Sequence, residues 1–394
     1  MRMSKTIGLV LVSVPGYSET FLRHKIDGLQ SRGFKVVLFV TERGATTDML
    51  GCKVVYAPNL NQKGWLLLKT YCAIALKAIF KNPLRSFKHL YYDTREKIPF
   101  LQAMKRTLLN QYLFSEQIDW LHFGFGMLAI KREHVAQAIG AKMAVSFRGA
   151  DLYLSPLKHP GCYDLLFKKE VSYHVLSQAM KKTLRDYGIS ESCITVIPPA
   201  IDVNFFSRSQ EIKSDLPLTF LTVARLHWKK GLEYTLEALA ILKTQQVSFR
   251  YHIVGAGDQY ERLAFAVHQL GLENEVCFEG RLSPSAVKSL MQRTAIYLQY
   301  SIQEGFCNAV LEAQAMGLLC IVSNAEGLPE NVIHGKTGWV VAKRSPKDLV
   351  EQIKAAIALT KSDKNIIKNN AMERVYRHFN LKDQQAAFAD FYSK

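Results

Sequence analysis

The sequence predicts an α/β protein in which two doubly wound parallel sheets form two domains. Short apolar runs alternate with helical stretches along most of the 394 residues, and this alternation is typical of parallel sheets that bind ligands at the carboxyl ends of their strands. The length favours two domains, each able to bury its own core. Two prolines in Ile197-Pro-Pro-Ala-Ile-Asp-Val-Asn-Phe-Phe206 forbid regular structure. We therefore place a hinge there, between domains at 1–200 and 201–379.

The first domain is expected to contain five strands, because five short apolar runs there alternate with helical stretches. The runs are Ile7 to Val14, Lys35 to Val40, Trp120 to Phe123, Ala144 to Phe147 and His174 to Leu176. The first run could also be the apolar part of a signal peptide. We interpret it as a strand, because it is short, lacks a small-residue cleavage site and runs directly into Pro15-Gly16.

The composition is that of an ordinary globular chain, with 48% apolar and 22% charged residues. Seven cysteines are scattered without C-x-x-C or metal-type spacing, which argues against a disulfide framework and makes a reducing cytosol the simplest compartment. No stretch reaches the roughly 18 consecutive apolar residues that a membrane-spanning helix needs. These observations disfavour the disulfide-rich and membrane-spanning classes.

Positive charge is concentrated in the first half of the chain. Residues 1–205 carry 28 Lys/Arg and 15 Asp/Glu, and residues 61–110 carry ten Lys/Arg against two acids. Basic residues in this segment recur at helical spacing beside large apolar residues, although Pro83 interrupts one continuous face. The segment is therefore a candidate for contact with an anionic membrane surface, and helices with a solvated basic side are the alternative. Nucleic acid is not an expected partner, because no zinc-finger spacing, aromatic strand motif or arginine-rich helix occurs.

One stretch of the second domain, Glu304-Gly-Phe-Cys-Asn-Ala-Val-Leu-Glu312, combines a strand end, a glycine turn and a helix. The apolar run Ala295 to Leu298 before it predicts a buried strand, and Gly305 lets the backbone pass close to a ligand. The backbone N–H groups expected to be free at the helix start are those of Phe306, Cys307 and Asn308. Such a helix start favours phosphate, with a carboxylate on either side for sugar hydroxyls. This geometry suits a nucleotide-sugar, and an ordinary surface helix is the alternative.

Two cations follow the strand that we predict at Thr219 to Val223. Arg225 ends that strand, and Lys230 stands just before a helix predicted at Leu232 to Leu242. Cations at the carboxyl end of a strand are where an α/β sheet would hold a diphosphate. A solvated basic loop is the alternative, and it is our interpretation of Lys229.

A glycine turn follows the next strand, in His252-Ile-Val-Gly-Ala-Gly-Asp258. Gly255 and Gly257 suggest a dinucleotide fingerprint, but Tyr260 occupies the place of its third glycine. An NAD-dependent dehydrogenase is therefore a remote interpretation. Near the chain end, Val375 to Tyr392 has a helical pattern.

Together these motifs resemble the retaining glycosyltransferases of family 4, which have the GT-B fold of two Rossmann-like domains facing a central cleft. Glu304 and Glu312 match the E-x7-E signature of that family. The resemblance is strong from Thr219 to Val341 and weak between Asn61 and Asn110. It implies that the last helix, at 380–394, crosses back to the first domain. A Ser-Glu-Thr-Phe loop before the first helix also resembles that of exopolysaccharide enzymes of the colanic-acid type.

The resemblance assigns roles to the motif residues. Glu304 would contact the transferred sugar and Glu312 the ribose hydroxyls, while Arg225 and Lys230 would neutralise the leaving nucleoside diphosphate. His122 matches a histidine that family members place near the transferred sugar, and a hydrogen-bonded core histidine is the alternative.

Further positions follow from the same resemblance. Those expected near the nucleotide are Gly255, Gly257, Arg281 and Leu282. Gly16 and Tyr17, in the loop after the first strand, are expected at the acceptor side of the cleft. Arg148 and Asp151 are expected there too, because they follow another predicted strand end. Asp151 could equally cap a turn. Glu326 and Cys307 replace glycines that are common in the family, so the identity of the donor cannot be carried over.

The activity that the resemblance implies is retaining transfer of a sugar from a nucleotide-sugar to a lipid-linked glycan, in cell-surface polysaccharide synthesis on the inner face of a membrane. No D-x-D motif occurs, so neither a metal nor another cofactor is expected. Arg225, Lys230 and the helix start would stabilise the departing diphosphate instead. Two alternatives stay open: a nucleotide-sugar epimerase of the same fold, and a catalytically silent nucleotide-sugar-binding subunit of a glycan assembly complex.

Overall fold

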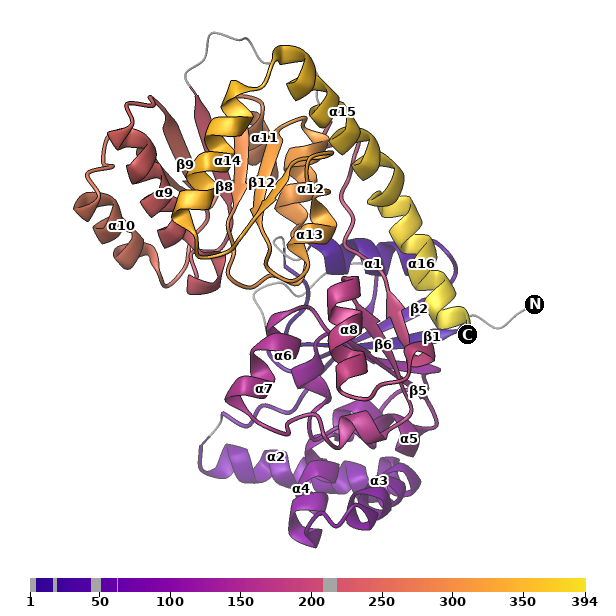
Figure 1. The fold of residues 1–394 in the computed structure, drawn as a ribbon. Helices are drawn as coiled ribbons and strands as arrows, with labels where there is room; N and C mark the ends of the chain where they lie inside the picture. Colours follow the sequence, from indigo (N-terminus) through magenta and orange to yellow (C-terminus); the bar gives the residue numbers. More distant parts are fainter. Residues whose placement is uncertain (1–4, 17–19, 44–50, 62, 208–217) are drawn as a thin grey trace. The chain divides into compact units, whose positions relative to one another are not determined.

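The computed structural model describes residues 5–16, 20–43, 51–61, 63–207 and 218–394. The chain divides into two compact units (Figure 1). Unit 1 consists of Met1–Val175, Lys181–Ile197 and Gln385–Lys394, and unit 2 consists of Leu176–Met180 and Pro198–Gln384. Each unit is built around its own parallel sheet.

Unit 1 contains a seven-stranded parallel sheet in the order β3-β2-β1-β4-β5-β6-β7. The strands are β1 (Thr6–Leu11), β2 (Lys35–Val40), β3 (Lys53–Tyr56), β4 (Trp120–Phe123), β5 (Lys142–Ser146), β6 (Val171–Val175) and β7 (Ile194–Val196). Because β1 pairs with β2 on one side and β4 on the other, the strand order reverses between β1 and β4. Such a reversal is where doubly wound sheets bind their ligands.

The five strands predicted for unit 1 are present, and two of them, β2 and β4, have the predicted bounds. β1 ends at Leu11, earlier than predicted. β3 and β7 were not predicted, because each is short and lies at an edge of the sheet, where only part of its surface is buried. Edge strands of this kind lack the apolar run that marks a central parallel strand.

The helices of unit 1 cover both faces of its sheet (Figure 1). They include α1 (Thr20–Gln30), α5 (Val135–Ile139), α6 (Ala150–Tyr153), α7 (Ser155–Lys158), α8 (Gln178–Asp186) and α16 (Leu381–Ser393). Of α8, the residues from Lys181 onward belong to unit 1, and of α16, the residues from Gln385 onward. Phe388, Phe391 and Tyr392 of α16 are buried in the same apolar cluster as Ile7 of β1 and Ile26 of α1. The chain end therefore completes the core of unit 1.

A group of helices lies between residues 63 and 110 and packs against α5 in unit 1. Among the residues that the structure describes, no helix is long and apolar enough to cross a membrane. The group consists of α2 (Trp65–Leu76), a π-helical turn η1 (Lys77–Lys81), α3 (Pro83–Arg95) and α4 (Phe100–Leu109). Pro83 is the first residue of α3, where its missing N–H is not needed. The predicted interruption at this proline is confirmed.

Unit 2 contains a six-stranded parallel sheet in the order β10-β9-β8-β11-β12-β13. The strands are β8 (Thr219–Val223), β9 (Arg250–Val254), β10 (Val276–Gly280), β11 (Ile296–Gln299), β12 (Leu319–Ser323) and β13 (Trp339–Val341). The strand order reverses between β8 and β11, as it does between β1 and β4 in unit 1. The predicted fold class is confirmed.

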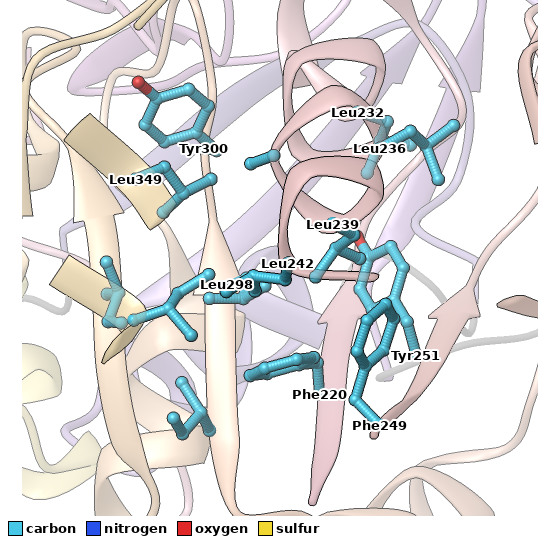
Figure 2. Close-up of a cluster of buried hydrophobic side chains, with 14 of the residues drawn as sticks. Phe220, Leu232, Leu236, Leu239, Leu242, Phe249, Tyr251, Leu298, Tyr300 and Leu349 are labelled. Atoms are coloured by element: carbon cyan, nitrogen blue, oxygen red, sulfur yellow. The ribbon is translucent and has the colours of Figure 1, made fainter. Parts of the chain in front are cut away.

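Helices pack against this second sheet through their apolar side chains, and Figure 2 shows the cluster that α9 (Leu232–Thr244) forms with the strands. The helices are α9, α10 (Tyr260–Gln269), α11 (Pro284–Met291), α12 (Asn308–Ala315), α13 (Leu328–Asn331), α14 (Pro346–Ala358) and α15 (Lys361–His378). Leu236 and Leu239 of α9 lie fully buried in one cluster with Phe220 and Tyr251 of neighbouring strands. The helices predicted to begin at Leu232 and Asn308 are confirmed.

The predicted continuous helix from Val375 to Tyr392 is wrong in one respect. It is broken at Phe379 and Asn380, which separate α15 from α16. The side-chain oxygen of Asn380 accepts a hydrogen bond from the backbone N–H of Asp383 at 3.0 Å, so Asn380 caps a new helix. Asn380 also bridges to Ile201.

Candidate active site

The loops after β8 and β11 place a lysine and a glutamate in contact. Lys230 ends the short 3-10 helix Trp228–Lys230 and forms an ion pair with Glu304. Their side chains are only 12% and 13% exposed. Each residue was predicted to have a separate role, and the structure adds that the two side chains neutralise one another.

The two loops are joined by their backbones. The N–H groups of Ile302 and Gln303 donate to the carbonyl of Lys229 at 2.8 and 3.2 Å. Gly231 follows with φ 62°, and a Cβ there would lie 2.2 Å from the carbonyl oxygen of Tyr300. Because no other residue fits both the conformation and the space, Gly231 fixes the position of Lys230 relative to the loop that carries Glu304.

The glycine turn after β9 packs against the loop that carries Arg225. A Cβ at Gly255 would lie 1.9 Å from the Ala224 carbonyl oxygen, and a Cβ at Gly257 would lie 2.1 Å from that of Leu226. Both glycines are therefore required by contact between two protein loops. Their predicted contact with a nucleotide stays a prediction.

The cations differ in their surroundings. Burial lowers the pKa of Lys230, but the charge and hydrogen bond of Glu304 outweigh this effect and raise its pKa overall. Lys230 is thus a permanent cation with limited exposure. Arg225 is exposed, and none of the described side chains pairs with its guanidinium in a salt bridge. It is available to an anion from solution.

The N-terminus of α12 offers fewer free donors than predicted. The N–H of Cys307 donates to Asn331 Oδ1 at 3.0 Å, and Asn331 returns a hydrogen bond to the Cys307 carbonyl. The prediction that this N–H is free is therefore wrong, because a side chain distant in sequence occupies it. Phe306 and Asn308 make no such side-chain contact among the described residues. Burial and the nearby Glu304 raise the pKa of the Cys307 thiol to about 12.

Glu312 lies on the first two turns of α12 and is partly buried. Burial raises the pKa of its carboxyl to about 7, and no ion pair relieves the cost of its charge among the described residues. A carboxylate in this situation gains from a ligand that donates hydrogen bonds. Ribose hydroxyls are donors of that kind.

Glu326 and Lys343 support the loop of Glu304, and sequence reasoning missed this arrangement. Glu326 Oε2 accepts a hydrogen bond from the Glu304 N–H at 2.9 Å, and Glu326 Oε1 lies 3.1 Å from Lys343 Nζ. A Cβ at Gly327 would lie 1.9 Å from the Gly305 carbonyl oxygen. The sequence marked Glu326 only as a departure from the family, and no motif marked Lys343.

Arg281 and Leu282 follow β10, where Gly280 has φ 65°. Arg281 is exposed and Leu282 is partly exposed. Among the described residues, neither side chain forms a hydrogen bond or ion pair with Lys230 or Glu304. Their predicted place beside a base stays a prediction.

His122 lies in unit 1, fully buried inside a chain of polar groups. Its Nδ1 is 2.5 Å from the Tyr392 hydroxyl and its Nε2 is 2.7 Å from Ser146 Oγ. Ser146 Oγ is also 2.7 Å from His174 Nδ1, and His174 Nε2 is 3.0 Å from the Ile197 carbonyl. Both ring nitrogens of His122 thus have protein partners, as expected for the alternative of a hydrogen-bonded core histidine.

This buried chain holds its histidines neutral. Burial, followed by the charge of Lys25, lowers the pKa of both His122 and His174 well below the usual range. Sequence reasoning missed the chain because its members are far apart; Tyr392 and His122 are separated by 270 positions. No local pattern marks such a contact.

The predicted acceptor-side residues have mixed surroundings. Asp151 is 7% exposed, and its oxygens accept hydrogen bonds from the N–H groups of Gly126 and Arg148 at 2.9 and 2.8 Å. Its carboxylate therefore connects the backbones of two loops, as expected for the alternative in which Asp151 caps a turn. The Arg148 guanidinium lies 3.9 Å from the Phe21 ring centre. A Cβ added at Gly16 would have no neighbouring atom within 4 Å. Tyr17 lies outside the described residues.

One group of described residues has the composition of a metal site. His252, Cys277 and Glu279 lie on the neighbouring strands β9 and β10, with potential ligand atoms within 4.8 Å of one another. His252 Nδ1 is 2.6 Å from Glu279 Oε1. No contact links this group to Lys230, Glu304 or Glu312 in the part of the chain that is described.

Residues 204–372, which include every motif residue of the β8 and β11 loops, match the family Glycosyl transferases group 1. The chain is 27% identical over 394 residues to "Putative colanic acid biosynthesis glycosyltransferase WcaL" of Escherichia coli strain K12, covering 95% of this chain and 96% of that protein. It is 29% identical over 345 residues to the amylovoran biosynthesis glycosyltransferase AmsK of Erwinia amylovora, covering 83% and 84%.

A solved structure shares the fold. The Anabaena protein Alr3699/HepE, crystallised in complex with UDP, superposes with a TM-score of 0.73 at 19% identity and covers 99% of both chains. At this identity the likeness concerns the fold.

Proposed function

We propose that this chain, which belongs to the group 1 glycosyl transferases of the GT-B fold, transfers a sugar with retention of configuration from a nucleotide-sugar held by unit 2. Its acceptor is a lipid-linked glycan, and the product is part of a cell-surface polysaccharide. The main support is the group of charged residues where the strand order reverses in unit 2. There Lys230 and Glu304 are paired, Arg225 is exposed, and Glu312 has a buried carboxyl without an ion pair among the described residues.

Each part of a nucleotide-sugar has a counterpart in this group. The oxygens of the diphosphate would replace Glu304 as the partner of Lys230, and they would also attract Arg225. The freed Glu304 would accept hydrogen bonds from the sugar, and Glu312 would accept them from the ribose. The ion pair thereby keeps both side chains in place before the donor arrives, which reduces the cost of ordering them on binding.

The chemistry in this proposal is electrostatic. Negative charge grows on the diphosphate as the bond to the sugar breaks, and Lys230, Arg225 and the N-terminus of α12 would stabilise it. The departing phosphate oxygen would take the proton of the acceptor hydroxyl on the same face of the sugar, so configuration is retained. Since the chain has no D-x-D motif, these cations take the place of a bound metal in the proposal.

A membrane-facing role is supported by the surface of the helical group at residues 61–110. We call the exposed apolar side chains of this group the α2–α4 surface: Trp65, Leu66, Leu68, Leu76, Ile79, Phe80, Leu84, Phe87, Tyr91, Phe100, Leu101 and Met104. Phe80 and Trp65 are 76% and 74% exposed. Large apolar side chains interleaved with lysines favour an anionic lipid surface, and an acceptor carried by a lipid would be reached there.

The donor experiment is a panel of nucleotide-sugars incubated with a membrane extract, with and without EDTA, and assayed for nucleoside diphosphate release. We expect one donor to be consumed at the same rate in EDTA. Loss of all turnover in EDTA would contradict the metal-free proposal. An isomerised donor formed without acceptor would indicate an epimerase, and binding without any turnover would indicate a silent subunit.

The membrane experiment is flotation with vesicles of phosphatidylglycerol and phosphatidylcholine. Phe80→Asp should lower the bound fraction several-fold, because it places a negative charge on the α2–α4 surface. Phe265→Asp is the matched control, since Phe265 of α10 is 61% exposed in unit 2. Equal loss in both variants, or none in either, would reject the proposed surface.

A further inference from the structure

We propose that unit 1 contains a binding site for the phosphate or pyrophosphate group of an anionic lipid, formed by two adjoining cavities beside α4. The inference rests on the proposed function, because it names the part of a lipid-linked acceptor that unit 1 would recognise. The cavity at the ends of β2 and β3 has a volume of about 600 Å³, and the one on the other side of Arg132 has a volume of about 240 Å³. Leu109 and Arg132 line both cavities.

The lining of the two cavities is strongly basic. The cationic side chains are Arg43, Lys105, Arg106, Lys131 and Arg132, and Glu42 is the acidic lining residue. One more acid, Glu133, lies 3.7 Å from Arg106 Nη1 and accepts a hydrogen bond from the Lys131 N–H at 2.9 Å. Cations therefore outnumber acids around both cavities, which favours a ligand with more than one negative charge.

Several buried donors in this lining have no partner. The Nε atoms of Arg106 and Arg132 are buried without a hydrogen bond to any described group. The Tyr112 hydroxyl is buried beside them, and the side chain of Arg132 is its neighbour. An unsatisfied buried polar group costs about 1–3 kcal/mol. All three groups can donate a hydrogen bond, and phosphate oxygens only accept. Glu133 Oε2 is an acceptor without a hydrogen bond among the described groups, and it lies 3.7 Å from Arg106 Nη1. A phosphate fits the donors of Arg106, Tyr112 and Arg132 better than a sugar hydroxyl, which would bring a donor of its own.

Arg132 is held between the two cavities by its own contacts. Its Nη1 donates to the Leu128 carbonyl at 2.8 Å, which leaves Nε as the unpaired donor. Burial raises the pKa of Tyr112, and the charge of Arg132 and a side-chain hydrogen bond with it act in the opposite direction, so the two groups are direct neighbours. One phosphate group could receive hydrogen bonds from both.

The lipid part of the proposal follows from the position of α4. Lys105 and Arg106 line the smaller cavity, and Leu101, one turn before Lys105 on the same helix, is 72% exposed. Phe100, at the start of α4, is 60% exposed and belongs to the α2–α4 surface. An apolar surface thus lies directly beside a cationic cavity. A lipid with a phosphate group has the matching arrangement of an apolar chain and an anionic head.

The test is isothermal titration calorimetry with three probes: farnesyl diphosphate, inorganic pyrophosphate and farnesol. All titrations use the full chain carrying Lys230→Ala, so that the cations of unit 2 contribute less to the signal. We expect farnesyl diphosphate to bind at least tenfold more tightly than inorganic pyrophosphate, and farnesol not to bind measurably. Equal affinity for the two diphosphates would overturn the lipid assignment and indicate a site for a free anion.

Two further substitutions locate the site. Arg132→Gln should weaken farnesyl diphosphate binding about tenfold or more, and Lys105→Gln should weaken it several-fold without a change in melting temperature, because Lys105 is exposed. Lys182→Gln, an exposed lysine of α8 in the same unit, is the control and should bind normally. Unchanged affinity in both cavity variants would overturn the proposal.

The inference and the proposed function can fail separately. A chain that turns over a nucleotide-sugar but binds farnesyl diphosphate independently of Arg132 and Lys105 refutes only the cavity site. A chain that binds farnesyl diphosphate through Arg132 but turns over no nucleotide-sugar with any membrane extract refutes the proposed function and retains the cavity site.

Discussion

Both sheets of this protein reverse their strand order once, yet the two reversal points differ in how their polar groups are satisfied. Between β1 and β4, the side chain of His122 is enclosed in a chain of hydrogen bonds from Tyr392 to the Ile197 carbonyl. Between β8 and β11, Lys230 and Glu304 satisfy each other while Arg225 and Glu312 lack a charged partner among the described residues. The same topology therefore gives a stabilising network in one unit and a candidate ligand site in the other.

The difference shows that a reversal of strand order does not by itself make a binding site. A buried polar group that already has two protein partners would have to lose them before it could contact a ligand, at a cost of about 1–3 kcal/mol each. An unpaired or exchangeable group gains from a ligand instead.

Lys230→Ala should have the largest effect, because it removes a cation from the place where the diphosphate is expected. Loss of one charge-stabilising group commonly lowers turnover by a factor of about 100–1000. The measurement is kcat/KM for nucleoside diphosphate release. Lys229→Ala changes the adjacent residue and should stay within a few-fold of the parent. Similar losses in both variants would mean that the loop, and not the Lys230 charge, matters.

His122→Leu should mainly affect stability, because it leaves the Tyr392 hydroxyl and Ser146 without their partner. We expect the free energy of unfolding to fall by about 2–4 kcal/mol, while Tyr392→Phe, which removes one hydroxyl, should lower it by about 1 kcal/mol. Denaturant titration measures both. If His122→Leu keeps its stability but loses turnover, His122 acts on the ligand as the sequence predicted, and the contrast between the two reversal points fails.

Acid should weaken unit 1 through the same histidines. Because His122 and His174 have pKa values well below the ordinary 6.5 in the folded state, the unfolded chain binds protons first as the pH falls. Their contribution to stability is complete above pH 6.5 and is lost progressively below it, with a slope of up to about 2.7 kcal/mol per pH unit for two such groups. Unfolding titrations between pH 7 and 5 check the sign. A His122→Leu chain should show a shallower slope.

Glu312→Gln should give a smaller effect, on affinity. Removing the carboxylate should weaken nucleoside diphosphate binding about tenfold, as for the loss of one charged hydrogen bond. With a pKa of about 7, the parent should also lose affinity as the pH falls through 7, because protonation removes the charge that accepts the ribose hydroxyls. The difference between parent and variant isolates Glu312, since both bind the same titrating ligand.

The same carboxyl has an effect of opposite sign on stability. Its pKa rises from 4.5 to about 7 on folding, so the folded chain holds this proton more tightly, and the resulting stabilisation is lost as the pH rises through 7. Glu312→Gln should therefore become the more stable chain between pH 4.5 and 7 and remain so above it. A constant difference across this range would show that Glu312 is not desolvated.

Local sequence patterns predicted much of the fold and part of the candidate site. Central strands such as β2 and β4 are continuous apolar runs, and the turn residues around Lys230 and Glu304 stand within a few positions of the strands they follow. The contact between Lys230 and Glu304 follows from the adjacency of β8 and β11, which the alternation of elements implies but does not specify.

Contacts between distant residues could not be predicted in this way. Asn331 occupies the N–H of Cys307, and Glu326 accepts the N–H of Glu304, each from a position more than twenty residues away. The enclosure of His122 depends on Tyr392, near the other end of the chain. In all three cases tertiary packing brings the partner residue into contact. A local sequence pattern carries no information about such packing.

The return of α16 to the first sheet has a consequence for biosynthesis. Phe388, Phe391 and Tyr392 complete the core of unit 1 but follow the whole of unit 2 in the chain. A ribosome therefore synthesises the part of α16 that belongs to unit 1 only after it has synthesised all of unit 2. Until then, the apolar side chains that α16 covers in unit 1, such as Ile7 and Ile26, lack part of their cluster, and exposed apolar surface of this kind favours aggregation during folding.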